Sequence, residues 1–390
     1  MMRRARVFLW PLLLVVTFCA RDLRFVPVPA ACRSRRSFSR IAARAEAFTA
    51  GDLALGGLFL GFCGAYLPQA LGLNGRAWQA GNIRYFTNRG TAAFSEAART
   101  LAEKHPGFQE DVVFTYFDTF QGELPYMGRP ARLVQLISRE VTDVYDHKRG
   151  LEERLREYNC ASGPFAETYF SKEEALAASE GEEAVLFFAK APGESGGRGI
   201  RVLRREEVLS ADISSDYVLQ RGVQDLELID GRKFVVRFYL LVYDHRIYLH
   251  EMGVLIVHGA RYDPTSVEDT VQVRHDWYDD ASDTRLLLLQ SVDEGPRWRE
   301  AIAAQLRAAA PALAPLLAAS STSRYVVVGG DALLRSNGES KLIELNMYPN
   351  LFADRELVDD QVYKPLTEDI LSLILFNQLS NRFEEIKHED

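Results

Sequence analysis

Residues 325–346, YVVVGGDALLRSNGESKLIELN, contain two apolar runs on either side of Asn337-Gly338. Asn-Gly between alternating apolar residues is the strongest short-range signal for a β-hairpin. A two-residue loop at this dipeptide pairs positions whose numbers sum to 675, so Asp331 is expected directly opposite Glu344. Side chains in that relation have Cβ atoms about 4.5–5.5 Å apart. The stretch therefore predicts an antiparallel hairpin that brings two carboxylates together.

Asn346 follows Glu344 by two residues and extends from the same face of the predicted strand, whereas Ile343 and Leu345 are expected to face a core. Carboxylates opposed across a sheet repel each other unless a positive charge lies between them. Two carboxylates and an amide oxygen are suitable ligands for a hard cation such as Mg²⁺. Asp331, Glu344 and Asn346 are therefore candidate metal ligands. The alternative is a solvated acidic face with a structural asparagine.

A long strand is predicted over Lys233–Val242, because apolar residues alternate onto one face that should be core. Two cations on the other face are costly in an interior strand unless they meet an anion. The alternative is an exposed edge strand. That other face carries Lys233, Val235, Arg237 and Tyr239. A turn at Asp244-His245 is expected to pair Lys233 with Ile256, Val235 with Val254 and Arg237 with Met252.

The stretch KAPGESGGRGI, residues 190–200, follows a short apolar run. Glycines allow backbone amides to turn toward an anion, and Lys190 adds a positive charge before the loop. The glycine spacing differs from that of the Walker loop and of the dinucleotide-binding fingerprint. The stretch is a candidate phosphate-binding loop, with a plain turn as the alternative.

Helical and extended patterns alternate along the body of the chain, and the second half is rich in hairpins. This organisation predicts an α+β (mixed α/β) fold with antiparallel sheets. Helices are expected over Ala92–Lys104, Val134–Glu157, Ala301–Leu317 (with Pro311 and Pro315 disturbing its end) and Pro365–Leu379. Strands are expected over Val112–Phe117, Val185–Ala189, Tyr217–Gln220, Lys233–Val242, Tyr248–Val257, Tyr325–Leu334 and Lys341–Asn346.

Charge is distributed unevenly along the 390 residues, whose formal net charge is −8. Residues 1–50 contain ten arginines, no lysine and only Asp22 and Glu46 as acids, which leaves residues 51–390 close to −16. A body of that sign is not expected to bind nucleic acid or anionic lipid through bulk charge. With 47% hydrophobic and 26% charged residues, the composition is that of an ordinary globular protein.

Cysteine usage excludes a disulfide framework or a zinc cluster in the body, because Cys160 is the only cysteine after residue 63. A lone cysteine is more often a small buried apolar residue than a nucleophile.

The N-terminal region is expected to consist of targeting segments. Residues 1–20 form a signal-like segment, and residues 21–50 are rich in arginine and serine and poor in acids, as in organelle transit peptides. Residues 51–75 include the uncharged stretch Leu53–Leu73, which is long enough for a single membrane span or a third targeting element. This order predicts the plastid of an alga with a complex plastid. The alternative is a membrane anchor and basic linker in the secretory system.

Eight segments between Asp146 and Leu371, about 225 residues, occur in an order that resembles the tubulin–tyrosine-ligase-like family of ATP-grasp ligases. The resemblance implies a variable N-terminal subdomain at residues 76–145 and ATP-grasp central and C-terminal subdomains at residues 146–390. The segments are HKRGLEERL, PFAETYF, FFAKAPGESGGRGIRVL, YVLQRGVQDLELIDGRKFVVRFYLLV, RIYLHEMGVLIVHGARY, GGDALL, KLIELNMYPNL and QVYKPLTEDIL.

The resemblance also implies that two antiparallel-rich sheets sandwich ATP, and that ATP and Mg²⁺ are the cofactors. It implies a ligase that adds a free amino acid to a protein or peptide carboxylate through an acyl phosphate. Lys233 and Arg237 would act in catalysis, and Asp331, Glu344 and Asn346 would bind the metal. Nucleotide contacts are expected from Lys190, Gly196, Gly197, Gly199, Gln220 (a polar contact to adenine), Arg221, Val223 and Lys233.

Several positions depart from the family pattern. Val235 replaces an aspartate, Ile256 replaces an arginine, and the stretch VEDTVQ at residues 267–272 lacks the expected asparagine. Arg335 stands where a second aspartate is usual. Arg261, Arg274 or His258 are candidates to replace the missing residues that contact the acceptor or the incoming amino acid. The chain is therefore either an active ligase with an altered acceptor or a catalytically silent nucleotide-binding module. The acidic body and the leader disfavour acidic tubulin tails as the acceptor.

Overall fold

The structure is a computed structural model that describes residues 76–87, 92–116, 131–160, 163–182, 184–192, 197, 199–273, 283–351 and 356–387. All of them belong to one compact unit, Phe62–Asp390. The expected signal-like, transit-like and hydrophobic segments at residues 1–75 lie outside the described residues, as do Gly196 and Arg274.

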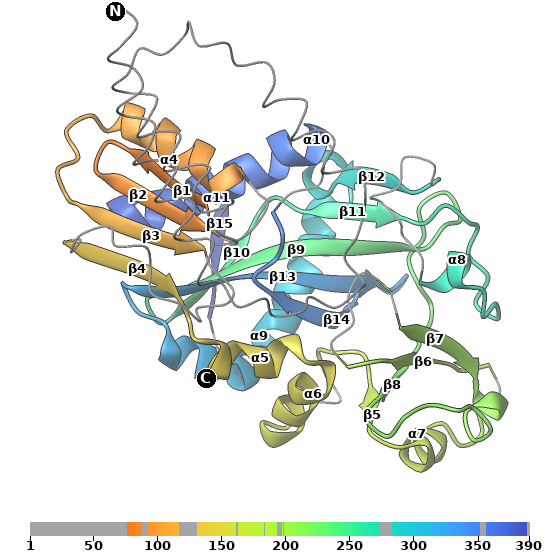
Figure 1. The fold of residues 1–390 in the computed structure, drawn as a ribbon. Helices are drawn as coiled ribbons and strands as arrows, with labels where there is room; N and C mark the ends of the chain where they lie inside the picture. Colours follow the sequence, from red (N-terminus) through yellow and green to blue (C-terminus); the bar gives the residue numbers. More distant parts are fainter. Residues whose placement is uncertain are drawn as a thin grey trace, which may run out of the picture. The chain divides into compact units, whose positions relative to one another are not determined.

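The larger of two sheets has eleven described strands, in the order β1-β2-β3-β4-β13-β9-β10-β15 (Figure 1). In addition, β11 pairs with β9 and β12, and β14 pairs with β13. The neighbours from β2 to β13 are parallel, and the remaining pairs are antiparallel. The strands are β1 (Arg76–Ala80), β2 (Ile83–Thr87), β3 (Val112–Tyr116), β4 (Arg132–Leu136), β9 (Phe234–Tyr243), β10 (Arg246–His250), β11 (Val254–Val257), β12 (Arg285–Leu288), β13 (Arg324–Leu334), β14 (Ser340–Met347) and β15 (Phe383–Ile386).

Strands β9 and β13 form the centre of this sheet, because both are long and almost entirely buried. Their apolar runs leave Arg237 and Asp331 as the charged side chains at the middle of the sheet. At these positions the energetic cost of burial is large unless the charges are paired. The sequence pattern thus places a charged site at the centre of the large sheet.

The smaller sheet has the antiparallel order β5-β8-β6-β7. Its core is separate and includes Phe187, Leu203 and Leu219. Main-chain hydrogen bonds from Ala166 N to Leu342 O (2.9 Å) and from Glu227 N to Leu334 O (2.9 Å) connect it to β14 and β13. Its elements are β5 (Thr168–Tyr169), α7 (Lys172–Ala178), β6 (Leu186–Lys190), β7 (Ile200–Arg204), the 3₁₀ turn Arg205–Glu207 and β8 (Val218–Arg221).

Helices cover the large sheet, and α4 packs against α11 next to β1 and β2 (Figure 1). The described helices are α4 (Ala93–Lys104), α5 (Arg139–Asp146), α6 (Lys148–Glu157), α8 (Asp269–Gln272), α9 (Gly295–Ala319), α10 (Glu356–Val358) and α11 (Lys364–Phe376). A 3₁₀ turn at Leu289–Ser291 precedes α9, and a π-helical turn at Asp359–Tyr363 precedes α11. The α+β class is therefore confirmed, with a parallel portion at β2–β4 that the sequence patterns did not predict.

Helix α9 packs against β9, β10, β13 and β14 and buries Trp298, Ile302 and Leu306. Among the described residues it is the one helix whose length and composition would suffice to cross a membrane. Its buried apolar side chains are those of a core helix.

The two prolines of α9 do not disturb its end, so that prediction was wrong. Pro311 and Pro315 lie four residues apart and therefore share one face of the helix, which is partly exposed. The carbonyl groups that lose an intrahelical donor to each proline also lie on that side. The helix continues because its opposite face is held in the core.

One expected helix, Val134–Glu157, is instead a strand followed by two helices. Val134 and Leu136 are buried in β4, which pairs in parallel with β3 and β13, and this packing outweighs local helical spacing. The extended backbone of His147 (ψ 121°) then separates α5 from α6. The other helices and strands occur close to the predicted positions, except for the strand Tyr248–Val257 discussed below.

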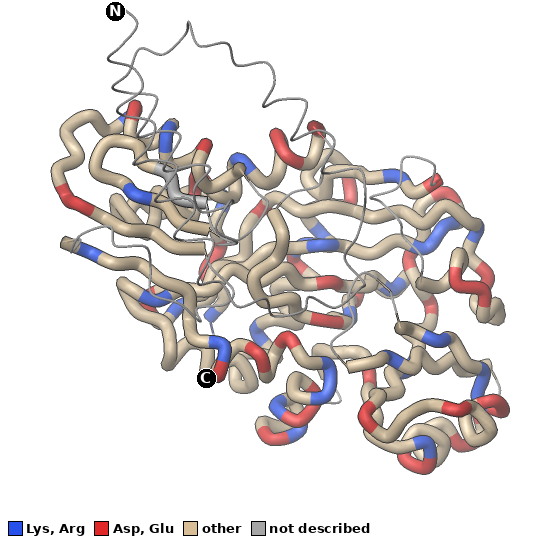
Figure 2. The backbone as a smooth tube through the Cα atoms, in the orientation of Figure 1, with Lys and Arg blue, Asp and Glu red and all other residues tan. Residues whose placement is uncertain are grey.

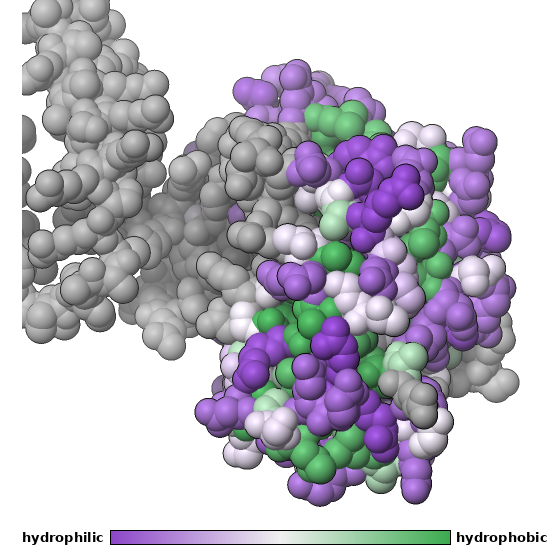
Figure 3. Space-filling view, turned by 90° about the vertical axis from the view of Figure 1, so that its right-hand side faces the viewer, coloured by the Kyte–Doolittle hydropathy of each residue, from purple (hydrophilic) through white to green (hydrophobic). Residues whose placement is uncertain are grey.

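The described surface carries both signs of charge (Figure 2). Hydrophilic residues cover much of the face in Figure 3, with apolar residues between them. Large exposed apolar side chains among the described residues are Leu209, Leu228, Leu357 and Leu379.

Candidate active site

A cleft of about 660 Å³ lies between the small sheet and the face of the large sheet formed by β9, β13 and β14. The segments that line it include β6, β8 with the residues that follow it, Lys233 with the start of β9, residues 258–273, and the β13–β14 hairpin. The predicted site residues that line it are Lys190, Gly197, Gln220, Arg221, Val223, Lys233, Arg237, Asp331, Glu344 and Asn346. Gly199 lies in the adjoining basin described below.

The β13–β14 hairpin brings Asp331 directly opposite Glu344, as predicted. Asn346 lies on the same face, and its Nδ2 donates a hydrogen bond to Glu344 Oε1 at 3.1 Å. Asp331 is only 3% exposed, and burial together with the charge of Glu344 raises its pKa to about 6. Burial also acts to raise the pKa of Glu344, but Lys190 and the hydrogen bond from Asn346 outweigh it and lower the value to about 2.

The turn of this hairpin differs from the prediction. Arg335 N bonds Glu339 O (2.8 Å), so the loop has three residues and ends at Gly338 with φ +90°. This shifts the register by one position, and a β-bulge between Asp331 and Ala332 shifts it back. The bulge explains why Ile343 is not buried in the core as expected but lines the cleft.

Arg237 lies directly opposite Asp331 on the neighbouring strand, and the two form a bidentate ion pair. Arg237 Nη2 donates to Asp331 Oδ2 at 2.9 Å, and Nε donates to Oδ1. The guanidinium opposes the effect of burial on the carboxyl and keeps the pKa of Asp331 from rising further. Each carboxylate oxygen has two lone pairs, so Asp331 can bind Arg237 and a cation together.

Two buried lysines face the same cleft from different sheets. Lys190, at the end of β6, is 6% exposed, and Lys233, just before β9, is 5% exposed. Burial lowers the pKa of Lys190, and burial with repulsion from Lys190 lowers the pKa of Lys233 to about 7. Lys233 Nζ donates to Gln272 O at 2.7 Å, an uncharged acceptor. A polyanion in the cleft would favour the charged form of both.

The glycine-rich loop is described in part. Gly197 (φ +73°) and Gly199 (φ +68°) have left-handed backbone conformations, which explains the need for glycine there. Gly199 O accepts a hydrogen bond from Ala191 N at 3.1 Å and so closes the loop next to β6.

The residues predicted to contact adenine lie on and after β8. Gln220 is buried and lines the cleft, and Val223 lies further along its wall. The guanidinium of Arg221 instead pairs with Glu167 (3.1 Å) and Glu182 on its own sheet.

The comparison with known families adds a separate observation. Residues 145–275 match the Tubulin-tyrosine ligase family. The segment is therefore similar to that family. The resemblance predicted from the motifs is confirmed, and it supports an ATP-dependent, ligase-like function in general terms. No curated protein matches the chain.

The segment matched to the tubulin-tyrosine ligase family contains Lys190, Gln220, Lys233 and Arg237, whereas the β13–β14 carboxylates lie beyond it. Ligases of this kind generally use ATP and Mg²⁺. The donor set in this chain fits a hard cation, because Asp331, Glu344 and the Oδ1 of Asn346 offer oxygen ligands at one place.

Two of the departures from the family pattern, Val235 and Ile256, are neighbours in space. The turn at Asp244-His245 sets the predicted register along β10, but residues 251–253 separate β10 from β11 and shift the pairing with β9 by two positions. Val235 therefore lies opposite Ile256, and the predicted pairs of Val235 with Val254 and Lys233 with Ile256 were wrong. Val254 lies opposite Arg237 instead, which also excludes the predicted pair of Arg237 with Met252.

Gly253 lies in this break, and a Cβ there would lie 3.0 Å from Arg237 O and from the side chain of Leu289, so the close packing favours glycine. The backbone N–H of Glu251 bonds Arg382 O (2.7 Å), and that of Met252 bonds His250 Nδ1 (3.2 Å). The segment thus satisfies its donors outside the sheet.

Polar residues that were not among the predicted site residues include Asp146 and Gln272, which line the cleft, and Thr168, which lies beside Gln220. Asp146 ends α5, accepts a hydrogen bond from Met347 N at 2.8 Å, and has a pKa that burial raises. The main-chain carbonyl of Gln272 accepts a hydrogen bond from Lys233 Nζ. The side-chain Nε2 of Gln272 donates to Asp263 O (2.9 Å) and Ser266 O (3.0 Å). Thr168 bonds Gln220. Only Gln272 had a sequence signal, because it lies where the family asparagine was sought.

The candidate substitutes for the missing family residues are placed differently. His258 lines the cleft and is buried next to Lys233, whose carbonyl accepts its N–H at 2.9 Å. Arg261 lies in a separate surface hollow with Arg232 and Arg285.

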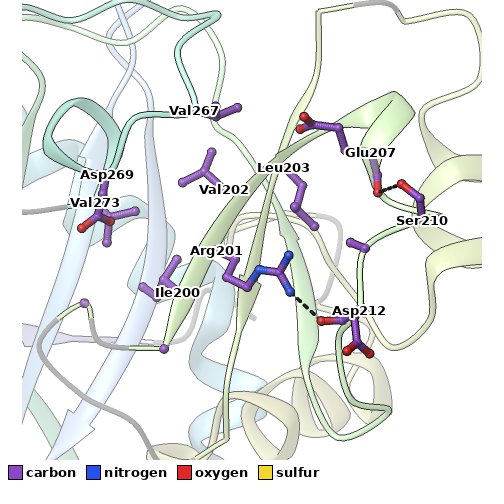
Figure 4. Close-up of a pocket in the computed structure, with 13 residues that line it drawn as sticks. Ile200, Arg201, Val202, Leu203, Glu207, Ser210, Asp212, Val267, Asp269 and Val273 are labelled. Carbon is purple, nitrogen blue, oxygen red and sulfur yellow. Dashed lines mark hydrogen bonds between the residues drawn. The ribbon is translucent and has the colours of Figure 1, made fainter.

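An open basin of about 900 Å³ adjoins the cleft and shares Gly197, Ile200 and Val273 with it. Figure 4 shows Arg201 reaching toward the Asp212 backbone, whose carbonyl it binds at 2.5 Å, and Ser210 bonded to Glu207 O at 3.1 Å. Val267 and Asp269 close the opposite side (Figure 4). The basin extends the cleft past the glycine-rich loop.

Proposed function

We propose that the protein is an ATP-dependent carboxylate–amine ligase that adds an amino acid to a protein or peptide acceptor through an acyl phosphate. The observation that carries this proposal is the convergence of two buried lysines and two opposed carboxylates on one cleft. Lysines suit the phosphates of ATP, and carboxylates suit a divalent cation that binds those phosphates. The family match is consistent with this assignment.

Each charged group has a distinct part in the proposed chemistry. Lys190 and Lys233 would neutralise phosphate oxygens, and Arg237 would balance the charge of Asp331 while lying close to the transferring group. Asp331, Glu344 and Asn346 would hold Mg²⁺, which supplies charge neutralisation for phosphoryl transfer. Because these groups are already buried and oriented, little reorganisation is needed when charge develops on the phosphate.

The proposed reaction has two balanced steps. An acceptor carboxylate oxygen bonds to the γ-phosphorus, the bond to the β–γ bridging oxygen breaks, and ADP leaves with the electron pair. The amine nitrogen then bonds to the acyl carbon, phosphate leaves, and the nitrogen loses a proton. The products are an amide, ADP and phosphate. A cleft that excludes water protects the acyl phosphate from hydrolysis.

The partners that this proposal requires are a free amino acid and a carboxylate on a protein or peptide. We propose an acceptor other than an acidic tubulin tail, because a body near −16 repels acidic chains. The leader composition supports residence in the plastid of an alga with a complex plastid, or else a single membrane anchor in the secretory system.

A catalytically silent nucleotide-binding module that acts by protein interaction is the second candidate. The observation that favours it is the apolar pair of Val235 and Ile256, which lies between Lys233 and Arg237 where family members carry opposite charges. This candidate predicts ATP binding without ADP formation.

ATP turnover by the full chain with Mg²⁺, measured while amino acids and small carboxylates are varied, separates the two candidates. A ligase releases ADP only in the presence of an acceptor, and Glu344→Gln should abolish the release because it weakens the cation site. Glu339→Gln, an exposed acid on the same hairpin, is the matched control and should leave the rate unchanged. Tight ATP binding without turnover under all conditions would exclude the ligase.

A further inference from the structure

Strand β7 is the last strand of the small sheet, and among the described residues it pairs only with β6. Ala191 N bonds Gly199 O, so the main-chain groups of Gly199 point toward β6. In an antiparallel pair this direction alternates from one residue to the next. The N–H and C=O groups of Ile200 and Val202 therefore point away from β6, and they form a free strand edge.

Arg204 is consistent with this alternation and marks one end of the free edge. Its N–H also points away from β6, and Glu207 Oε2 accepts it at 2.7 Å. The carboxylate of Glu207 thus closes the edge at that end. At the other end, Ile200 pairs with Lys190, and both residues line the cleft. The open part of the edge leads from Val202 toward the lysine proposed to bind phosphate.

The basin of about 900 Å³ surrounds this edge. Ile200 and Val202 extend to one side of β7, and Arg201 extends to the other (Figure 4). All three residues line the basin. A cavity that is lined by both faces of a strand passes around the edge between them. Because the basin shares Ile200 with the cleft, a chain that lies along β7 leads directly into the cleft.

The charges around the basin favour a basic occupant. Among the described residues that line it, the acids are Glu207, Asp212 and Asp269, and Arg201 is the one basic residue. The guanidinium of Arg201 is bound to Asp212 O at 2.5 Å. The carboxylates of Asp212 and Asp269 are exposed and form no ion pair within the described part of the chain. They are therefore available to a positively charged ligand.

We propose that the free edge of β7 binds an extended segment of the acceptor as an added β-strand, and that this segment carries basic side chains. Main-chain hydrogen bonds to Ile200 and Val202 supply affinity, as in other cases of strand addition. Asp212 and Asp269 select for positive charge. At about 3.3 Å per residue, a carboxylate shortly beyond Ile200 enters the cleft. The inference rests on the proposed ligase function and adds the means by which the acceptor is recognised.

Two short labelled peptides test the charge preference, one of alternating lysine and valine and one of alternating glutamate and valine, both ending in glutamate. Fluorescence anisotropy with the full chain should show the lysine peptide binding about tenfold tighter or more at low salt, with a smaller difference at high salt. The double variant Asp212→Asn/Asp269→Asn should remove most of this preference. Asp216→Asn, an exposed acid outside the basin, is the matched control and should keep it. Equal binding of both peptides to the wild-type chain would overturn the inference.

N-methylation of the lysine peptide tests strand addition without changing the protein. Methyl groups on every second residue remove the N–H donors from one edge of the peptide and leave its side chains in place. One of the two alternate methylation patterns should abolish binding and the other should retain it, because an added strand presents one edge to β7. Equal effects of the two patterns would overturn the inference.

Val202→Pro removes an N–H that faces the basin, and an edge strand tolerates proline at such a position. Val202→Ala keeps this N–H and is the matched control. The proline variant should lose about tenfold or more in peptide affinity and the alanine variant much less, with ATP affinity unchanged in both. Equal peptide affinities in two variants that thermal unfolding shows to be folded would contradict strand addition.

ATP binding and ADP release, measured on the same samples, separate this inference from the proposed function. ATP binding without binding of the lysine peptide would overturn the inference alone. Peptide binding without ADP release at any amino acid would overturn the ligase and leave strand addition to β7 in place.

Discussion

The β13–β14 and β9–β10 hairpins both have a turn at the predicted place, yet the predicted register is kept at the site in one and lost in the other. In the β13–β14 hairpin a bulge restores the predicted pairing before it reaches Asp331 and Glu344. Beyond the β9–β10 hairpin, residues 251–253 displace the pairing by two positions and bring Val235 opposite Ile256. A turn therefore predicts cross-strand partners only as far as the first irregularity. Charged partners resulted in the first case and apolar partners in the second.

The largest effect is expected from removing Arg237 of β9, the positive charge that balances Asp331 in the β13–β14 hairpin. Arg237→Met leaves Asp331 buried without its bidentate partner and should lower the free energy of unfolding by about 3–5 kcal/mol. Urea unfolding of the full chain measures this change. The double variant Arg237→Met/Asp331→Leu should recover most of the stability, because an apolar pair needs no counter-charge. No recovery would contradict the view that charge balance holds these strands together.

The apolar pair of Val235 on β9 and Ile256 on β11 allows the opposite experiment, in which charges are introduced. Val235→Asp and Ile256→Arg should each destabilise the fold, because each places a charge in a buried position. Together they should couple favourably by about 2 kcal/mol, since the two side chains lie directly opposite each other. A double-mutant cycle from urea unfolding measures the coupling. A value near zero would exclude the observed register.

The pH dependence of ATP affinity tests the lysine at the start of β9. The pKa of Lys233 is about 7 without ligand, below its ordinary value, and a bound triphosphate would raise it again. Binding above pH 7 must therefore take up a proton, so ATP affinity should fall with rising pH by up to about tenfold per unit. Lys233→Arg stays charged and should flatten the profile. A flat wild-type profile would show that Lys233 does not meet the phosphates.

The smallest effect is expected at the turn of the first hairpin. Gly338→Ala places a side chain at φ +90° and should cost about 1 kcal/mol of stability. Gly107→Ala, a glycine with open space around it, is the control and should change stability much less. Thermal unfolding of both variants gives the comparison, and equal effects would argue against backbone strain at the turn.

Patterns close together in the sequence were the ones that predicted the structure correctly. The alternation of β9 required no knowledge of distant residues and gave the buried face of Phe234 and Val236. The Asn337-Gly338 signal gave the hairpin, but the Asp331–Glu344 pair was predicted correctly only because the β-bulge offsets the three-residue loop. The glycine-rich stretch indicated Lys190 and the resemblance added the Gln220 hinge, and the structure brings both to the same cleft.

The rest depended on partners that are distant in the sequence. Local spacing predicts a helix over β4, because its pairing with β3 and β13 is not visible in the nearby sequence. The short strands β1, β7, β12 and β15 have few residues and depend on their neighbours in the same way. Ile343 lines the cleft because of the β-bulge, and its carbonyl accepts a hydrogen bond from Gln220 of the other sheet, a contact for which a single sequence has no pattern.

The attachment of the small sheet has a topological consequence. The chain enters this lobe through Phe165, which bridges Leu342, and leaves it through Leu226, which bridges Arg335, so both crossings occur on the same hairpin. The small sheet and α7 thus form an insertion whose first and last residues both contact the β13–β14 hairpin. The line through these two contacts is a natural hinge axis. Rotation about that line would open the cleft without breaking the large sheet. Amide hydrogen exchange should then show ATP protecting residues 165–167 and 224–227 more than the interior of either sheet, which links the protection of these crossings to closure.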